Sequence, residues 1–186
     1  ILESLGARLV AVMDHTGALR TTTADSAVNA RELAAHVAVH HSIKGYKRPE
    51  LEPVDRQTFY STPVDVFIPA ALERMVDKQV AEWLNCRVVA EGGNGPCSPE
   101  ADAILAYRNI AILPAILCNA GGVTVSYLEW VQNKAGVHWE LRRVDAELKK
   151  TIVNAARRGR RAAQKYSIDM CTAAYAVAID HIVKAY

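Results

Sequence analysis

Four short apolar runs along the chain predict buried β-strands, and segments with helical spacing separate them. The first run is rich in Leu and Val without polar alternation, which is typical of a parallel strand covered on both faces. It ends at Asp14, and a turn is expected at Thr16 and Gly17. The four predicted strands are residues 7–13, 64–68, 86–90 and 110–113.

Apolar residues with helical spacing predict the intervening elements. Residues 26–40 and 72–84 place apolar side chains every three or four positions, which is typical of helices. Ser98 is suited to cap a third helix, because Pro99 follows at the first helical position, and this helix is expected to end near residue 108. Residues 44–53 contain Gly and Pro and are predicted to form a loop.

The last third of the chain shows no strand pattern and is predicted to be helical, over residues 122–131, 139–166 and 168–186. Strands that alternate with helices favour parallel pairing with right-handed crossovers. The sequence therefore predicts an α/β fold with a doubly wound, mainly parallel sheet and a helical carboxyl-terminal third. In such folds ligands bind beyond the carboxyl ends of the strands.

Composition limits the class of protein. The chain has 186 residues, 51% of them hydrophobic, which is enough for one substantial core and a single domain. Its net charge of +2 gives no reason to expect nucleic acid or a membrane as a partner. The longest apolar run, residues 110–118, is interrupted by Pro114 and is too short to span a bilayer. We expect a soluble, cytoplasmic protein.

The cysteines and histidines do not predict a metal site. The four cysteines lie far apart without a CxxC pair, which argues against structural zinc or a disulfide framework and favours reduced thiols. His36 and His40 have i, i+4 spacing, but the glutamate of an HExxH motif is missing. The cysteines are Cys86, Cys97, Cys118 and Cys171.

The first residues suggest that the chain is part of something longer. Residues 1–5 resemble the last turns of a helix with Gly6 as its C-cap, and no initiating methionine is present. A GxGxxG fingerprint, which precedes a ribose-binding acid by about 20 residues in dinucleotide folds, would lie before Ile1.

Polar side chains follow three of the predicted strands. Asp14 stands where an acid can accept hydrogen bonds from adenosine ribose hydroxyls, although a turn-forming aspartate is the simpler alternative. Asn94, within EGGNGP, and Asn119 follow the third and fourth strands. A carboxamide both donates and accepts, so each could hold a nicotinamide ribose or amide. An ordinary glycine-asparagine turn is the alternative for Asn94.

Ser126 comes seven residues after Asn119, about two helical turns, so a helix from Gly121 would place both side chains on roughly the same face. The sequence suggests a buried hydroxyl that could meet a carboxylate, whereas a purely structural serine is the alternative. We expect Asp14, Asn94, Asn119 and Ser126 to lie along one crevice.

Four segments of the chain carry a family resemblance: NAGGVTVSYLEWVQN (119–133), EGGNGPCSPEAD (91–102), IPAAL (68–72) and DMCTAAYAVAI (169–179). They resemble the cofactor domain of the glutamate dehydrogenase (Glu/Leu/Phe/Val dehydrogenase) family, and the resemblance covers nearly the whole chain. It implies a Rossmann-like dinucleotide-binding domain over residues 1–186, truncated at its amino terminus, with residues 139–186 as a helical extension. Departures from the family are Gly93, Cys97 and Ser98, where alanine and paired threonines are usual.

The resemblance implies that Ala70 and Ala71 line the cofactor cleft and that Ser126 touches the side-chain carboxylate of the substrate. The implied reaction is oxidative deamination of L-glutamate to 2-oxoglutarate and ammonia, with hydride passed to NAD or NADP. In this family the catalytic lysine and aspartate come from an amino-terminal substrate domain. No catalytic residue is therefore expected in this segment, and the isolated segment should show no steady-state turnover.

The sequence leaves alternatives open for the cofactor, the substrate and the function. The charge of Asp14 disfavours the 2′-phosphate of NADP, so NAD or dual use is preferred, although family members with a similar acid use either cofactor. A leucine, valine or phenylalanine dehydrogenase would share the architecture, but Ser126 argues against it. A non-catalytic binding module could use the basic run at residues 157–161, yet Asp145 and Glu147 on the same helix favour a solvated or subunit-contacting face. The family usually forms homohexamers.

Overall fold

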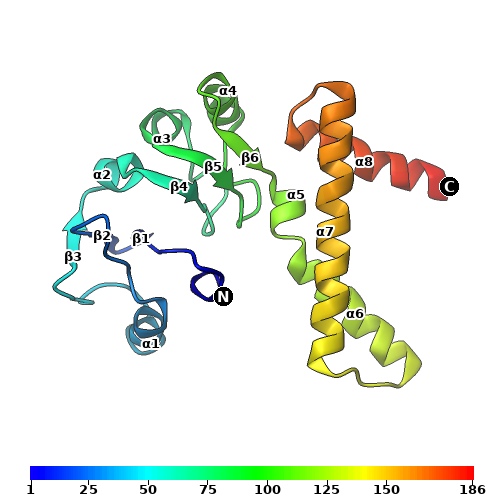
Figure 1. Ribbon diagram of the computed structural model, residues 1–186, viewed down its shortest axis with the longest axis horizontal. Helices are drawn as coiled ribbons and strands as arrows, with labels where there is room; N and C mark the ends of the chain where they lie inside the picture. Colours follow the sequence, from blue (N-terminus) through cyan, green and yellow to red (C-terminus); the bar gives the residue numbers. More distant parts are fainter. The chain divides into compact units, whose positions relative to one another are not determined.

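The computed structural model describes residues 1–186, which form two compact units (Figure 1). The first unit consists of Ile1–Val64 and Glu82–Cys86, and the second of Asp65–Ala81 and Arg87–Tyr186. No helix combines the length and the apolar character that a bilayer crossing requires.

The first unit contains a three-stranded antiparallel sheet in the order β1-β2-β3. Its strands are β1 (Ala11–Asp14), β2 (Gly17–Thr21) and β3 (Leu51–Val54), and its helices are η1 (Glu3–Leu5), α1 (Ala30–His40) and α2 (Arg56–Ser61). The side chain of Asn29 caps α1 by accepting hydrogen bonds from the N–H groups of Arg31 and Glu32. The core of this unit consists of Val28, Leu33, Ile43 and Tyr46, with Leu9, Val12, Leu19, Val37 and Leu51 packed around it.

The prediction of a buried parallel strand at residues 7–13 is wrong. Regular pairing begins at Ala11, and β1 pairs antiparallel with β2 in a hairpin whose last pair is Asp14 with Gly17. Gly17 has a φ of 152°, a conformation that glycine adopts most readily, and Asp14 caps the turn. All four residues of β1 are only half-buried, so their apolar side chains do not require helices on both faces.

The loop predicted over residues 44–53 is corrected at its end, where Leu51 begins β3. Pro53 lies within this strand and pairs with Leu19 of β2. Strand β3 lies at the edge of the sheet and pairs only with β2. Proline has no N–H to donate, and it is tolerated here because no strand lies on the other side of β3. The helix predicted from residue 26 likewise starts later, at Ala30, after the Asn29 cap.

The second unit is built on a sheet with the order β4-β5-β6, of which only the first residues of β4 and β5, Val64 and Cys86, are counted with the first unit. Its strands are β4 (Val64–Phe67), β5 (Cys86–Ala90) and β6 (Ala111–Leu113), and β5 and β6 are parallel, with Val88 opposite Ala111 and Ala90 opposite Leu113. Helix α4 (Pro99–Tyr107) connects β5 to β6, and the Ser98 hydroxyl accepts a hydrogen bond from Ala101 N–H at its start. These strands, this helix and the α/β fold agree with the prediction.

The helix predicted over residues 72–84 is much shorter, because α3 covers only Lys78–Trp83. Arg74 has a left-handed φ of 54° and donates its N–H to the carbonyl of Gly95. Val76 donates its N–H to Pro96 and accepts from Ser98, so it forms an isolated parallel bridge with Cys97. The backbone groups before α3 are thus used by the loop after β5, and they cannot also form helical hydrogen bonds.

The last third of the chain is helical, as predicted. It contains α5 (Ala115–Cys118), α6 (Gly121–Ala135), α7 (Leu141–Tyr166) and α8 (Met170–Ala185). The long helix α7 packs against the other three (Figure 1). Gly159 of α7 is buried, and a Cβ at this position would lie 3.0 Å from the Met170 Cε and 3.5 Å from the Leu117 Cδ1. A larger residue at this position would require the end of the Met170 side chain to move.

Candidate functional site

Three neighbouring chain segments meet at the carboxyl ends of the strands in the second unit. Residues 68–71 follow β4, residues 91–95 follow β5, and Asn119 lies beyond β6, between α5 and α6. Because β5 and β6 are parallel, their carboxyl ends lie at the same edge of the sheet. This is the edge at which ligands bind in open α/β sheets.

The segments after β4 and β5 are in close contact. The N–H of Gly93 donates to the Pro69 carbonyl at 2.9 Å. A Cβ on Gly92 would lie 3.1 Å from the Cβ of Ala70, closer than most real side-chain contacts. Ala70 and Ala71 are both exposed. The glycines therefore allow the two segments to touch and leave a surface lined by small side chains.

Asn94 and Asn119 are joined by a hydrogen bond, whereas the sequence led us to expect only that they lie along the same crevice. The Nδ2 of Asn119 donates to the Oδ1 of Asn94 at 2.6 Å and to the carbonyl of Gly93 at 3.3 Å. Asn94 is exposed, and Asn119 is half-buried. The Nδ2 of Asn94 and the Oδ1 of Asn119 bond to no other protein group, so the pair presents one donor group and one acceptor group to a ligand.

Glu91, which the sequence analysis did not single out, holds these segments in place. It is 7% exposed, its N–H donates to the Leu113 carbonyl at 3.1 Å, and its Oε2 accepts from Ala115 N–H at 2.8 Å. The side chain thus ties the end of β5 to the end of β6 and the start of α5. Its position directly after a predicted strand was the only signal in the sequence.

Ser126 differs from the expectation. Helix α6 begins at Gly121 as assumed, but Asn119 is the C-cap of α5 and is not part of α6, so the count of two helical turns does not relate the two side chains. Ser126 is exposed, and the predicted burial of its hydroxyl is wrong because this face of α6 is not covered. No protein hydrogen bond uses the hydroxyl, which leaves it available to a ligand.

Asp14 lies in the first unit and has a clear structural role. Its Oδ1 accepts from the N–H and the hydroxyl of Thr16 at 2.7 and 2.6 Å, and its Oδ2 accepts from Ile43 N–H at 2.8 Å. Burial acts to raise the pKa of Asp14, but the hydrogen bonds from Thr16 and Ile43 outweigh it and lower the pKa below its ordinary value. A carboxylate has about four acceptor positions, so roughly one remains for a ligand hydroxyl.

A cavity of about 380 Å³ lies beside this carboxylate, within the first unit. It includes Thr16 and Ile43, both of which bond to Asp14, and also Lys44 and Lys47. Neither lysine has an ion-pair partner. The cavity therefore offers basic side chains to a ligand, next to two residues that bond to Asp14.

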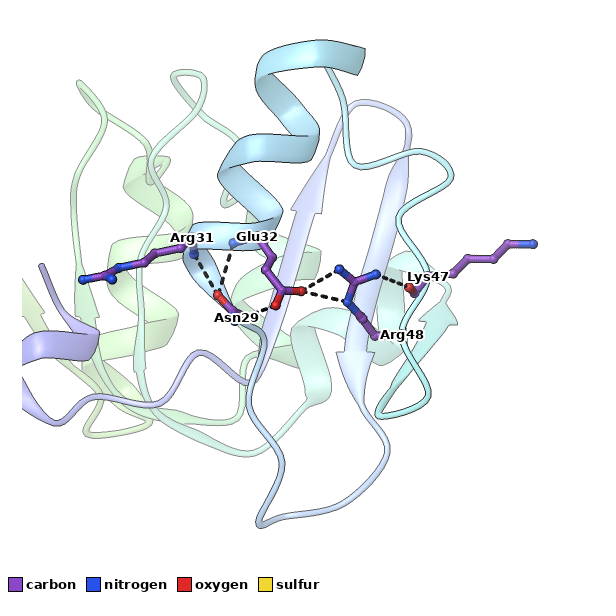
Figure 2. A network of polar contacts seen from close by, with 5 residues as sticks. All are labelled: Asn29, Arg31, Glu32, Lys47 and Arg48. Atoms are coloured by element: carbon purple, nitrogen blue, oxygen red, sulfur yellow. Dashed lines mark hydrogen bonds and ion pairs between the residues drawn. The ribbon is translucent and has the colours of Figure 1, made fainter.

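Arg48 lines the same cavity, but its positive charge is paired with the carboxylate of Glu32. Its Nε and Nη2 donate to the Oε2 of Glu32 at 2.9 and 2.5 Å, and its Nη1 donates to the Lys47 carbonyl (Figure 2). Asn29 supports the pair by donating from Nδ2 to the Oε1 of Glu32 at 3.1 Å. The side chain of Lys47 points away from this network (Figure 2). The free positive charge at the cavity is therefore carried by the lysines.

The thiols of the second unit are poor candidates for nucleophiles. Burial, assisted by the charge of Glu91, raises the pKa of Cys97 far above its usual range, and burial with Glu91 and Asp102 raises the pKa of Cys171 to about 12. Burial, with Glu91 and Asp169, also raises the pKa of Asp102. At neutral pH both thiols are protonated, which removes the reactive thiolate.

Two other groups from the sequence do not form a site. The rings of His36 and His40 lie 4.2 Å apart, but the nearest polar contact of His36 Nε2 is the Lys44 carbonyl at 3.0 Å, and no acidic or thiol ligand joins the pair. The arginines at residues 157, 158, 160 and 161 are exposed on α7 without ion pairs. Nothing in either group indicates a bound ligand.

Comparison with known proteins identifies the family. A sequence profile of Glutamate/Leucine/Phenylalanine/Valine dehydrogenase matches residues 1–186. The glutamate dehydrogenase of Thermotoga maritima is 38% identical over 185 residues, which are 100% of this chain and 43% of that protein. The NADP-specific glutamate dehydrogenase A1 of Halobacterium salinarum is 36% identical over 187 residues, with 100% and 44% covered.

A solved structure supports the same relationship and the Rossmann-like fold. The hetero-hexameric glutamate dehydrogenase of Thermus thermophilus, in its Leu-bound form, superposes with a TM-score of 0.86 at 25% identity, covering 99% of this chain and 42% of that one. The chain spans less than half the length of these relatives. It belongs to the Glutamate/Leucine/Phenylalanine/Valine dehydrogenase family.

Proposed function

We propose that this chain is the cofactor-binding part of an NAD(P)-dependent dehydrogenase that converts L-glutamate to 2-oxoglutarate and ammonia. Its membership of the family supports the class of reaction. The observation that carries the proposal is the contact between Asn94 and Asn119 at the carboxyl ends of parallel strands. A donor and an acceptor held together at this edge suit the amide and ribose of nicotinamide.

The task of this segment is to hold the cofactor in a fixed geometry. When bound, NAD or NADP would supply the acceptor for a hydride from the α-carbon of the amino acid. Transfer requires the reacting carbons to be held close together in a fixed orientation. Asn119 bonds to both Asn94 and Gly93, so the carboxamides are oriented before the cofactor arrives. Ala70 and Ala71 are small and exposed, which lets the cofactor approach the backbone.

In the first unit we assign Asp14 to a ribose hydroxyl of the adenosine. Its remaining acceptor position and the adjacent cavity of about 380 Å³ support this role. Lys44 and Lys47 line the same cavity and can offset the repulsion between Asp14 and a 2′-phosphate. We therefore favour NAD or dual use of NAD and NADP.

Ser126 is assigned to the side-chain carboxylate of glutamate, because its hydroxyl is exposed and without a protein partner. In a leucine, valine or phenylalanine dehydrogenase we expect an apolar group at that place instead of a hydroxyl. We assign no catalytic acid or base to this chain. The chemistry then needs a separate substrate domain, and residues 1–186 form the dinucleotide-binding domain with residues 139–186 as its helical extension. We also propose that the whole enzyme is a homo-oligomer.

The asparagine pair can be tested in the intact enzyme. Replacing Asn119 with alanine removes its bond to Asn94 and a ligand acceptor, each worth about 1 kcal/mol, so the dissociation constant of NAD(P)H should rise about 5- to 30-fold. Asn94→Ala should act similarly. Because the two side chains contact each other, the double variant should lose less affinity than the sum of the single losses. Fluorescence titration of the reduced cofactor measures these constants.

Asn133→Ala is the matched control. Asn133 lies at the other end of α6, is exposed, and has no side-chain hydrogen bond, so its loss should leave cofactor affinity unchanged. If Asn119→Ala and Asn133→Ala behave alike, the proposed cofactor contact is wrong. Additive losses in the double variant would show that the two carboxamides act independently.

A further inference from the structure

Three side chains with metal-binding atoms converge beneath the loop that follows β5. Glu91 directly follows β5, Cys97 lies in the loop, and Asp102 lies in the first turn of α4. A carboxylate oxygen of each acid and the Sγ of Cys97 all lie within 4.8 Å of one another. Ligands of a tetrahedral zinc ion stand roughly 3.4–3.8 Å apart, given bonds of about 2.0–2.3 Å. The limit of 4.8 Å is wider than this spacing, so the three side chains must close around an ion when it binds.

The surroundings favour a positive charge. The Oδ1 of Asp102 is fully buried and has no hydrogen-bond partner. Glu91 is also buried, and neither acid forms an ion pair with a basic side chain. Buried charges are normally paired or bound to metal, and buried acceptors are normally satisfied. A cation coordinated at this point satisfies the Asp102 oxygen and offsets the charge of both acids.

We propose that Glu91, Cys97 and Asp102 bind Zn²⁺ or a divalent ion of similar ligand preference. A thiolate with two carboxylates suits zinc, whereas Mg²⁺ and Ca²⁺ prefer oxygen ligands alone. On binding, the thiol proton passes to solvent and a metal–sulfur bond replaces it. No sequence motif indicates this site, because its ligands come from a strand end, a loop and a helix without a recognisable spacing.

The ion has a structural consequence for the loop between its ligands. It ties the end of β5 to the first turn of α4 and closes residues 91–97 into a short ring that contains Asn94. Metal binding therefore orders the loop that carries one of the proposed cofactor contacts. The site does not depend on the proposed enzymatic function, because metal binding is measured without cofactor or substrate.

Cobalt is a suitable probe, since Co²⁺ bound to a thiolate absorbs in the near ultraviolet. Titration of the purified protein with Co²⁺ should produce this absorption with one equivalent bound, and added Zn²⁺ should abolish it. Cys97→Ser should lose the absorption. Cys86→Ser is the matched control and should keep it, because Cys86 lies at the opposite end of β5 from Glu91, about 16 Å away at the rise of a strand.

A second variant guards against a folding defect. Asp102→Asn retains the thiol but removes a carboxylate, and we expect it to bind Co²⁺ at least tenfold more weakly while its circular dichroism stays unchanged. The proposal is overturned if the wild-type protein gives no thiolate absorption. It is also overturned if the absorption survives in Cys97→Ser or if Asp102→Asn binds as tightly as the wild type.

Discussion

Replacing Asp14 with asparagine should keep the hydrogen bonds of this side chain with Thr16 and remove its hydrogen bond with Ile43. The side-chain oxygen of asparagine can still accept both hydrogen bonds from Thr16, so the hairpin turn is kept. Its NH₂ group, however, would face the N–H of Ile43, which at present donates to Oδ2 at 2.8 Å. Two donors then point at each other, and the Ile43 N–H loses its acceptor.

The structure sets the size of the effect. Ile43 is 6% exposed and belongs to the core of the first unit, so water replaces the lost acceptor poorly. An unsatisfied buried donor costs about 1–3 kcal/mol. The protection of the Ile43 amide against hydrogen exchange should therefore fall about 5- to 150-fold. Asp25→Asn is the control: Asp25 is exposed and has no hydrogen bond, so protection should not change.

The effect should depend on pH in a defined direction. The pKa of Asp14 is lowered in the folded protein, so its stabilising contribution is complete above the ordinary value of 3.8. As the pH falls through the lower folded pKa, the carboxylate is protonated and the contribution is lost. The difference between wild type and Asp14→Asn should therefore shrink below about pH 4.

Hydrogen exchange, followed by mass spectrometry or NMR, measures the local stability of the first unit at Ile43. This measurement is preferable to unfolding of the whole chain, because the chain has two compact units. Exchange free energies at pH 6 and near pH 3 give both the size and the pH dependence of the effect. Unchanged protection of Ile43 in Asp14→Asn would refute the assigned hydrogen bond. A difference that stays constant down to pH 3 would refute the role of the ionised carboxylate.

Two further predictions concern the second unit. In the intact enzyme, Ser126→Val should lower kcat/KM for glutamate about 10- to 100-fold without impairing leucine turnover, because a hydrogen bond to a charged group is lost. Thr124→Val is the control, because the Thr124 hydroxyl bonds to the Ala120 carbonyl. Undiminished glutamate turnover in Ser126→Val would exclude the assignment. Gly92→Ala should lower the free energy of unfolding, measured by urea denaturation, by about 1–3 kcal/mol, because the new Cβ would lie 3.1 Å from the Cβ of Ala70. Gly121→Ala is the control and should not lower it, because the space around Gly121 is open. Equal effects of the two substitutions would contradict the close packing at Gly92.

Local signals in the sequence were sufficient for much of the second unit. The apolar run at β5 and the Ser98–Pro99 pair at the start of α4 each determine an element through nearby residues alone. The placement of Asn94 and Asn119 at neighbouring strand ends could also be predicted, because parallel strands bring their carboxyl ends to one edge, but their direct hydrogen bond could not. These inferences needed only the chain order and the pairing rule.

Other features depend on partners that the local pattern does not specify. The apolar residues of β1 fit a parallel or an antiparallel strand equally well, and the turn capped by Asp14 decides between them. Residues 72–77 have helical spacing, but their backbone bonds with the loop after β5 exclude a longer α3. The exposure of Ser126 likewise depends on what covers α6, which no spacing within the helix reveals.

Asn119 and Ala120 are the only residues between α5 and α6, so any change in the angle between these helices must pivot at this joint. The 2.6 Å bond from Asn119 to Asn94 fixes one side of the pivot to the loop after β5. Movement of the α5 side of this joint therefore requires this bond to stretch or break. The carboxamide that we propose to contact the cofactor is thus also the anchor of the joint between the two helices.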